Sequence, residues 1–216
     1  MMQRLRIRFT RGEEIKFISH LDIMRLWQRA FNRAGIQMAY SEGFNPHPRM
    51  SLAAPLALGV TSEAELMDIV LTRWSSPQAF TAAVSRQLPL GVNMLQVLPL
   101  GLELPSLQSQ VCFAEYSVAV PTALDASAAT ASLDALLDRE TIPWQHRRDT
   151  GLRNYDLRPL IEDVWLMETR PGLCIIGMRL QCDSKGSGRP EQVVLAAGFE
   201  ERPSFIHRTR LVLQAK

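Results

Sequence analysis

Cysteine is scarce in this sequence, and its spacing does not form a metal-binding pattern. Cys112, Cys174 and Cys182 make no CxxC or CxxxCxxC motif. A zinc ribbon or an iron–sulfur cluster bound by this chain is therefore not supported. Cys112 and Cys174 lie in apolar, strand-like runs, which is typical of cysteines that act as small buried hydrophobic residues.

Long apolar runs are lacking as well. The start, MMQRLRIRF, alternates charged and apolar residues and has no apolar segment of the kind found in secretion signals. No run approaches the roughly 20 apolar residues that a membrane-spanning helix needs. We therefore expect a protein of the reducing cytoplasm that has no membrane partner.

The sequence also lacks a large excess of charge of one sign, because its formal net charge is +2. A nucleic-acid partner would therefore require basic residues that are clustered rather than numerous. Lysine occurs only as Lys16, Lys185 and Lys216, so the basic residues are mostly arginine. Arginine suits bidentate contacts with phosphate, although a GC-rich genome would produce the same bias.

Familiar catalytic and nucleotide-binding motifs are missing. The sequence contains no GxGxxG, GxxxxGK[ST], GxSxG or HExxH pattern. Dinucleotide binding, P-loop chemistry, serine hydrolysis and metalloproteolysis therefore have no support. Whether the chain is an enzyme stays open, and a non-catalytic role is favoured.

The pattern of apolar residues predicts an α+β protein built from two similar halves. In the first half, strands are predicted at 4–10, 50–58, 65–72 and 92–98, with helices at 19–34 and 77–88. In the second half, strands are predicted at 114–120, 173–181 and 205–213, helices at 126–139 and 190–197, and extended or mixed structure at 143–148 and 155–167. We predict two tandem ferredoxin-like (βαββαβ) units with antiparallel sheets. They would span residues 1–98 and 112–216, joined by a linker at 99–111.

The first predicted strand alternates basic and apolar residues. Arg4, Arg6 and Arg8 share one face, and Leu5 and its alternate neighbours share the other. This period of two predicts a half-buried strand with a basic, solvent-facing side.

The first predicted helix carries a row of arginines. Ser19-x-x-Asp22 resembles a capping box, and Gly35 is a typical residue to end the helix. The apolar residues recur at a spacing of three to four and predict a buried stripe: Ile23, Met24, Trp27, Ala30, Phe31 and Ala34. Arg25, Arg29 and Arg33 fall on the opposite side, where they could follow a phosphate backbone. An ordinary solvated helix face is the alternative.

A loop of turn-forming and polar residues follows at 41–48, within the segment YSEGFNPHPR. Its two prolines stiffen the backbone, which suits a site that presents side chains. Asn45, His47 and Arg49 are the polar candidates for nucleic-acid contacts, while Phe44 and Tyr40 could stack on a base. The alternative is a structural loop in which Phe44 is buried.

His20, Asp22 and His47 are candidate metal ligands or acid–base groups. A spacing of two residues is unsuitable for two ligands on one helix face, so we predict no metal site. His20 or His47 could act as a general acid or base, because histidine titrates near neutral pH. The sequence identifies no nucleophile or second base to work with them.

The second half contains a further basic region with one aromatic residue. Arg147 and Arg148 lie in one short segment and Arg158 lies in the segment RNYDLRP. We include these three arginines among the candidate nucleic-acid contacts, with a solvated surface as the alternative.

The segments FISHLDIMRLWQRAFNRAGI and YSEGFNPHPRMSLAAPLALG resemble the radical SAM-linked protein family, a domain of unknown function. The similarity extends over nearly the whole chain and includes DLRPLI and the closing HRT. It implies a domain found beside, or fused to, cobalamin-binding radical SAM proteins. S-adenosylmethionine, the iron–sulfur cluster and cobalamin would then belong to the partner, and this chain would hold no cofactor. The resemblance implies no catalytic residues.

Three functional hypotheses follow from the sequence. The first is a non-catalytic accessory domain that binds RNA, either tRNA or rRNA, for a radical SAM RNA-modifying enzyme. The second is a small RNA-processing enzyme that uses His20 or His47. The third is a protein-interaction module that docks a radical SAM partner.

Overall fold

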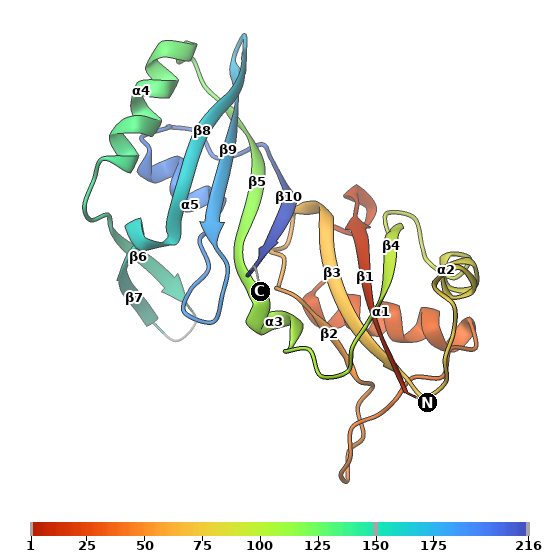
Figure 1. The fold of residues 1–216 in the computed structure, drawn as a ribbon. Coiled ribbons are helices and arrows are strands. Elements are labelled where there is room, and N and C mark those ends of the chain that lie inside the picture. The colour runs from red at the N-terminus through yellow and green to blue at the C-terminus, as the bar shows by residue number, and fades with distance from the viewer. Residues whose placement is uncertain (1, 149–150, 215–216) are drawn as a thin grey trace. The chain divides into compact units, whose positions relative to one another are not determined.

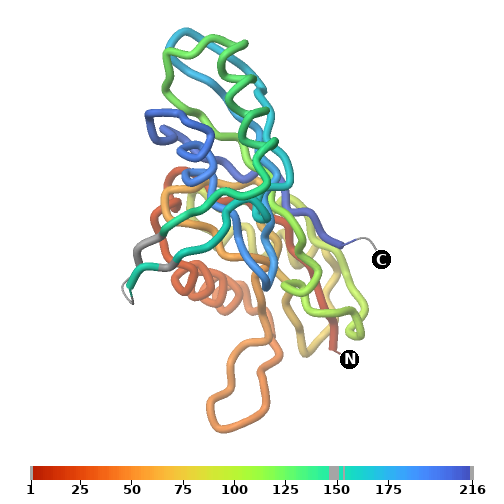
Figure 2. Tube along the Cα trace, turned by 90° about the vertical axis from the view of Figure 1, so that its left-hand side faces the viewer, coloured from red at the N-terminus to blue at the C-terminus, as the bar shows by residue number. Residues whose placement is uncertain are grey.

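The structure is a computed structural model that describes residues 2–148 and 151–214 (Figures 1 and 2). The chain divides into two compact units, the first running up to Val111 and the second covering Cys112–Leu213. Helices and largely antiparallel strands occur in both, so the predicted α+β class is confirmed. Within the described residues, no helix is long and apolar enough to cross a membrane.

Unit 1 contains its main elements in the predicted order β-α-β-β-α-β. They are β1 (Gln3–Arg11), α1 (His20–Arg33), β2 (Met50–Leu52), β3 (Thr61–Leu71), α2 (Pro77–Ser85) and β4 (Met94–Leu100). A single 3-10 turn, η1 (Glu13–Ile15), precedes α1, and the short helix α3 (Leu107–Gln110) follows β4. The strand order is β4-β1-β3-β2, and each neighbouring pair is antiparallel.

Helix α1 begins and ends where its sequence predicts. The Ser19 hydroxyl accepts a hydrogen bond from the Asp22 backbone N–H, which satisfies one of the free donors at the helix start. Gly35, with a φ of 70°, turns the chain away just beyond the helix, a conformation that glycine adopts without steric cost. The predicted apolar stripe is confirmed, with Ile23, Trp27 and Phe31 fully buried.

The core of unit 1 is organised around a chain of aromatic rings. Trp27 meets Phe9 edge-on, with ring centroids 4.9 Å apart, and Phe31 at 5.4 Å. Phe31 in turn contacts Phe80 of α2, with centroids 5.9 Å apart. Both helices therefore pack on the face of the sheet that carries Phe9 and its alternate neighbours in β1. Aromatic contacts of this kind stabilise a core beyond the area that they bury.

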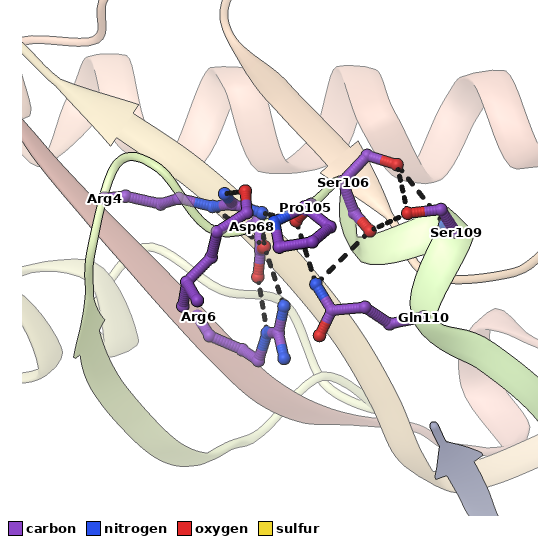
Figure 3. A network of polar contacts seen from close by, with 8 residues as sticks. Arg4, Arg6, Asp68, Pro105, Ser106, Ser109 and Gln110 are labelled. Atoms are coloured by element: carbon purple, nitrogen blue, oxygen red, sulfur yellow. Dashed lines mark hydrogen bonds and ion pairs between the residues drawn. The ribbon is translucent and has the colours of Figure 1, made fainter. Parts of the chain in front are cut away.

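The other face of β1 is not the solvent-facing basic surface that its alternation predicts. Arg4 is buried and Arg6 is partly buried, because both guanidinium groups bond to the carboxylate of Asp68 on β3, at 2.6 Å and 2.7 Å (Figure 3). Arg4 also donates to the backbone carbonyls of Leu104 and Pro105. Of the three arginines on this face, only Arg8 is exposed.

The segment predicted as the linker 99–111 is ordered and belongs to unit 1. It includes the end of β4 and all of α3, and the Leu107 side chain is fully buried. Gln110 donates from its side chain to the carbonyls of Pro105 and Ser106 (Figure 3). Of the two prolines in this segment, Pro99 lies in β4, and Pro105 lies in a strap that is bound to the sheet by Arg4.

Unit 2 follows the same order of elements with one insertion. Its main elements are β5 (Val111–Pro121), α4 (Ala126–Leu137), β8 (Ile161–Arg170), β9 (Leu173–Gln181), α5 (Pro190–Ala196) and β10 (Phe205–Leu213). The strand order within the unit is β10-β5-β9-β8. This matches the order β4-β1-β3-β2 of unit 1, element by element along the chain.

The insertion is a hairpin of β6 (Pro143–Arg148) and β7 (Gly151–Asp156), which pair antiparallel. A 3-10 turn, η2 (Arg158–Leu160), then separates β7 from β8. The extended or mixed structure predicted over 155–167 is thus the end of β7, a 3-10 turn and most of β8. The Asp156 carboxylate caps the turn by accepting from the Arg158 backbone N–H at 3.0 Å, and Pro159 interrupts strand pairing.

We predict that Asp68→Ala strongly destabilises the protein. The substitution leaves the charge of Arg4 buried without its partner, and breaking such a pair typically costs about 3–5 kcal/mol. Urea unfolding followed by circular dichroism measures the change. Glu168→Ala is the matched control, because its ion pair with Arg170 is exposed and should contribute little. A loss for Asp68→Ala no larger than that of the control would contradict the prediction.

Candidate functional site

The packing of α1 determines which of its side chains reach the surface. With Ile23, Trp27 and Phe31 turned into the core, Arg25, Arg29 and Arg33 are exposed, as predicted. They are spaced four residues apart, so each is about 6 Å further along the helix axis than the one before. The result is a row of three positive charges on a rigid element.

This row forms one wall of a groove with a volume of about 480 Å³. The opposite wall is the segment that follows α2, from Arg86 to Pro89. Four arginines and one acidic residue, Asp22, therefore line the groove. We refer to the groove, defined by Arg25, Arg29, Arg33 and Arg86, as the arginine groove.

Contacts hold two of these arginines in position. The Arg33 Nη2 group donates to the backbone carbonyl of Gln87 at 2.8 Å, which joins the two walls. The Arg25 Nη1 group donates to the Asp22 carboxylate at 3.2 Å. Arg29 and Arg86 are exposed and, within the described residues, take part in no hydrogen bond or ion pair. Their guanidinium donors are available to an anionic ligand.

Asp22 lies in the first turn of α1, where its carboxylate takes part in the contacts of the helix start. The Ser19 hydroxyl donates to its carboxylate at 2.7 Å, and this bond, followed by that from Arg25, lowers the pKa of Asp22. Among residues 2–148 and 151–214, no three His, Cys, Asp or Glu side chains are grouped to hold a metal ion.

The loop at 41–48 projects from unit 1 (Figures 1 and 2). We refer to it as the projecting loop. Its base is closed by a bridge between Tyr40 and Pro48, by a bond from the Ser41 N–H to the His47 carbonyl and by one from the His47 N–H to the Ser41 hydroxyl. These contacts join the two ends of the loop to each other.

The side chains of the projecting loop are presented to solvent. Phe44 is fully exposed, so the alternative in which it is buried is wrong. Asn45, His47 and Arg49 are also exposed, and Tyr40 is about half exposed at the base. An aromatic ring without any cover on a tethered loop is suited to insertion into a partner.

Neither candidate general acid or base has a catalytic environment. His20 is the first residue of α1, and both His20 and His47 are exposed. In the described part of the chain, neither imidazole hydrogen-bonds to a carboxylate, hydroxyl or thiol. The structure therefore brings no second group to either histidine.

The candidates in the second half have different outcomes. The side chains of Arg147 and Arg148 lie outside the described part of the structure. Arg158 donates to the carbonyls of Leu137, Arg139 and Ile161 at 2.8–3.1 Å. Its guanidinium therefore ties the end of α4 to the start of β8, which gives Arg158 a structural role.

The second wall of the arginine groove was missed by the sequence reasoning. Arg86 and its neighbours lie about 60 residues after α1, and no periodic pattern links them to it. The only local signal is a basic residue at the predicted end of a helix, which is common in helices that lack a binding role.

Residues 4–190 match the model of a family described as an uncharacterized protein conserved in bacteria, DUF2344. The chain belongs to the DUF2344 family. No curated protein matches it by sequence. The family description contains no activity, so the function must be argued from the site.

Two solved structures resemble this DUF2344 protein in fold. One is a chain of a Cbf5–Nop10–Gar1 complex, with a TM-score of 0.51, 10% identity, and coverage of 96% of this chain and 48% of that chain. The other is a chain of an H/ACA RNP bound to a substrate RNA containing 2'-deoxyuridine, with a TM-score of 0.52, 10% identity, and coverage of 96% and 47%. The DUF2344 chain thus spans about half the length of these proteins. At this identity the likeness concerns the fold alone.

We predict that Ser19→Ala raises the pKa of Asp22 towards its ordinary value of 3.8. Because the native pKa is lowered, the stabilisation by this carboxylate is present above pH 3.8 and is lost as the pH falls through the lowered pKa. Carboxyl-detected NMR titration of the wild type and the variant measures the shift. Asp183, in unit 2, is the internal control and should keep its pKa. An unchanged pKa of Asp22 would show that Ser19 does not stabilise its charged form.

Proposed function

We propose that this DUF2344 protein binds RNA through the arginine groove of unit 1. The observation that carries the proposal is the groove itself, in which four arginines surround one carboxylate in a chain whose formal net charge is only +2. The positive charge that binding requires is therefore gathered at one place, as recognition of a phosphate backbone demands.

The geometry of the groove supports a polyanion rather than a single small anion. Arg25, Arg29 and Arg33 extend over more than two turns of α1 at regular intervals. Arginine forms paired hydrogen bonds with phosphate oxygens, and successive side chains can contact successive phosphates along a strand. Neutralising several phosphates releases counterions, which makes such binding strongly dependent on salt.

The projecting loop would add base contacts to these phosphate contacts. We propose that Phe44 stacks on an unpaired base and that Asn45 hydrogen-bonds to a base edge. Arg49 and His47 would contact the backbone nearby. Aromatic side chains that stack on splayed bases are a common means of binding single-stranded RNA segments.

The fold offers support by analogy. We infer that both units are ferredoxin-like, because the strand orders β4-β1-β3-β2 and β10-β5-β9-β8 correspond element by element. One of the structures with a similar fold is an RNP bound to a substrate RNA. A shared fold does not establish a shared function, so this analogy ranks below the groove as support.

We further propose that the RNA is tRNA or rRNA and that the chain serves a radical SAM RNA-modifying enzyme in the cytoplasm. This part rests on the resemblance of the sequence to radical SAM-linked proteins. The partner would supply S-adenosylmethionine, the iron–sulfur cluster and cobalamin. The present chain would contribute RNA binding and no catalytic group.

We predict that the triple variant Arg25→Ala, Arg29→Ala, Arg33→Ala loses RNA affinity. Removing three phosphate contacts should lower the slope of log K against log salt by about 2 to 3, and weaken binding at low salt by at least about tenfold. Fluorescence anisotropy with labelled total tRNA at several salt concentrations measures both quantities.

The matched control is Arg73→Ala, Arg202→Ala, Arg210→Ala, which removes the same number of exposed positive charges from residues that do not line the groove. It should keep most of the affinity and of the slope. If both triple variants bind tRNA as the wild type does, the groove is not the RNA site. If the groove variant and the control variant lose tRNA affinity equally, the loss reflects the lower net charge of the protein rather than the groove.

We predict a separate effect for Phe44→Ala. Loss of base stacking should weaken binding of single-stranded RNA by about 1–3 kcal/mol while leaving the salt slope unchanged. Phe44→Trp should retain the binding because it keeps an aromatic face. Anisotropy with a labelled single-stranded oligonucleotide measures the change, and equal affinities for the alanine and tryptophan variants would rule out stacking.

A further inference from the structure

The sheet of unit 2 has a face that neither of its helices covers. Helices α4 and α5 lie on the same side of this sheet (Figure 1). The side chains that alternate towards them, such as Val118 and Met178, are fully buried. The opposite side chains of the edge strand β8, Asp163 and Trp165, are exposed. We refer to this side of the sheet as the outer face of unit 2.

Trp165 is the main apolar feature of the outer face. It lies directly opposite Gly177 on β9, and a Cβ atom at position 177 would be only 2.1 Å from Trp165 Cε2. The glycine therefore makes room for the indole to pack against the backbone of the sheet. The ring still exposes 38% of its surface, so part of it is available to a partner.

The charges around Trp165 leave one carboxylate unmatched. Arg179 pairs with Glu115 at 2.7 Å, and Arg170 pairs with Glu168 at 2.6 Å, so these four charges cancel locally. Arg179 also lies directly opposite Asp163 in the register of β8 and β9. Asp163 is exposed and, within the described residues, takes part in no hydrogen bond or ion pair. It precedes Trp165 by two residues on the same strand and therefore lies on the same face. These two arginines and three carboxylates therefore leave a net charge of −1 near the indole.

We propose that the outer face of unit 2 docks a basic segment of a protein partner, one arginine of which packs on Trp165 and pairs with Asp163. Tryptophan is the aromatic side chain that attracts cations most strongly, and a guanidinium can contact a ring while it hydrogen-bonds to a carboxylate. A phosphate backbone would instead be repelled by Asp163. This site is independent of the RNA contacts of the arginine groove.

The test uses the full chain and a defined probe, a 12-residue glycine–serine peptide that contains three arginines. NMR of the labelled protein follows the tryptophan indole N–H signals during titration. The peptide should shift the Trp165 signal and leave that of Trp74, exposed in unit 1, in place. The same peptide with citrulline, which is uncharged, in place of arginine should shift neither.

Substitutions then separate the two contacts. Trp165→Leu and Asp163→Asn should each weaken peptide binding by about twofold to fivefold. Glu168→Gln, on the same strand, is the control and should bind as the wild type does. Gly177→Val keeps the tryptophan but displaces it, and should also weaken binding. Because Asp163→Asn changes an exposed side chain, it provides the decisive comparison if Trp165→Leu or Gly177→Val does not fold.

Two results would overturn the proposal. One is unchanged affinity of the arginine peptide for Asp163→Asn or for folded Trp165→Leu. The other is a shift of the Trp165 signal by a single-stranded oligouridylate but not by the arginine peptide, which would assign the face to RNA. Neither result tests RNA binding by the arginine groove, because that binding is tested separately, by how the tRNA affinity of the groove variants depends on salt concentration.

Discussion

The packing of Trp27 against Phe9 and Phe31 is the interaction on which the candidate RNA site depends. The indole is fully buried between α1 and the sheet, and its Nε1–H finds no hydrogen-bond partner in the described part of the structure. Leaving such a donor unpaired costs about 1–3 kcal/mol, which the burial of the aromatic cluster must offset. The same packing fixes the rotation of α1 about its axis. Because Trp27 is turned into the core, the opposite side of α1 faces solvent. That side carries the row of Arg25, Arg29 and Arg33.

A second constraint acts on the opposite face of the sheet. The single carboxylate of Asp68 forms ion pairs with both Arg4 and Arg6, and Arg4 also donates to the carbonyls of Leu104 and Pro105 in the strap that follows β4. Arginines therefore have two distinct uses in unit 1. Arg4 and Arg6 on β1 are bound by Asp68 within the protein, whereas the arginines of α1 face solvent beside few acidic groups. Counting basic residues in the sequence does not distinguish these uses.

Much of the local structure could be predicted from residue spacing. The capping serine, the buried stripe of α1 and the exposure of its arginines follow from a period of 3.6 and from helix-end chemistry. The roles of Arg4 and Arg158 could not be predicted, because their partners, Asp68 and the carbonyls at the end of α4, are distant in the sequence and have no pattern that links them. The roles of Arg86 in the groove and of Gly177 beneath Trp165 could not be predicted either, because the residues that they meet are also distant or unlinked by any pattern in the sequence.

The sequence by itself determined the order of the main elements of unit 1, the residues that start and end α1, and the row of arginines on one side of it. These depend on interactions between residues a few positions apart, which composition and period reveal. Tertiary structure alone decided which charged residues are neutralised inside the protein and which remain available. It also decided that Arg86 completes a groove with α1 and that the outer face of unit 2 exposes a tryptophan beside an unpaired carboxylate. The physical reason is that charge pairing and burial depend on contacts between strands and helices far apart in the chain.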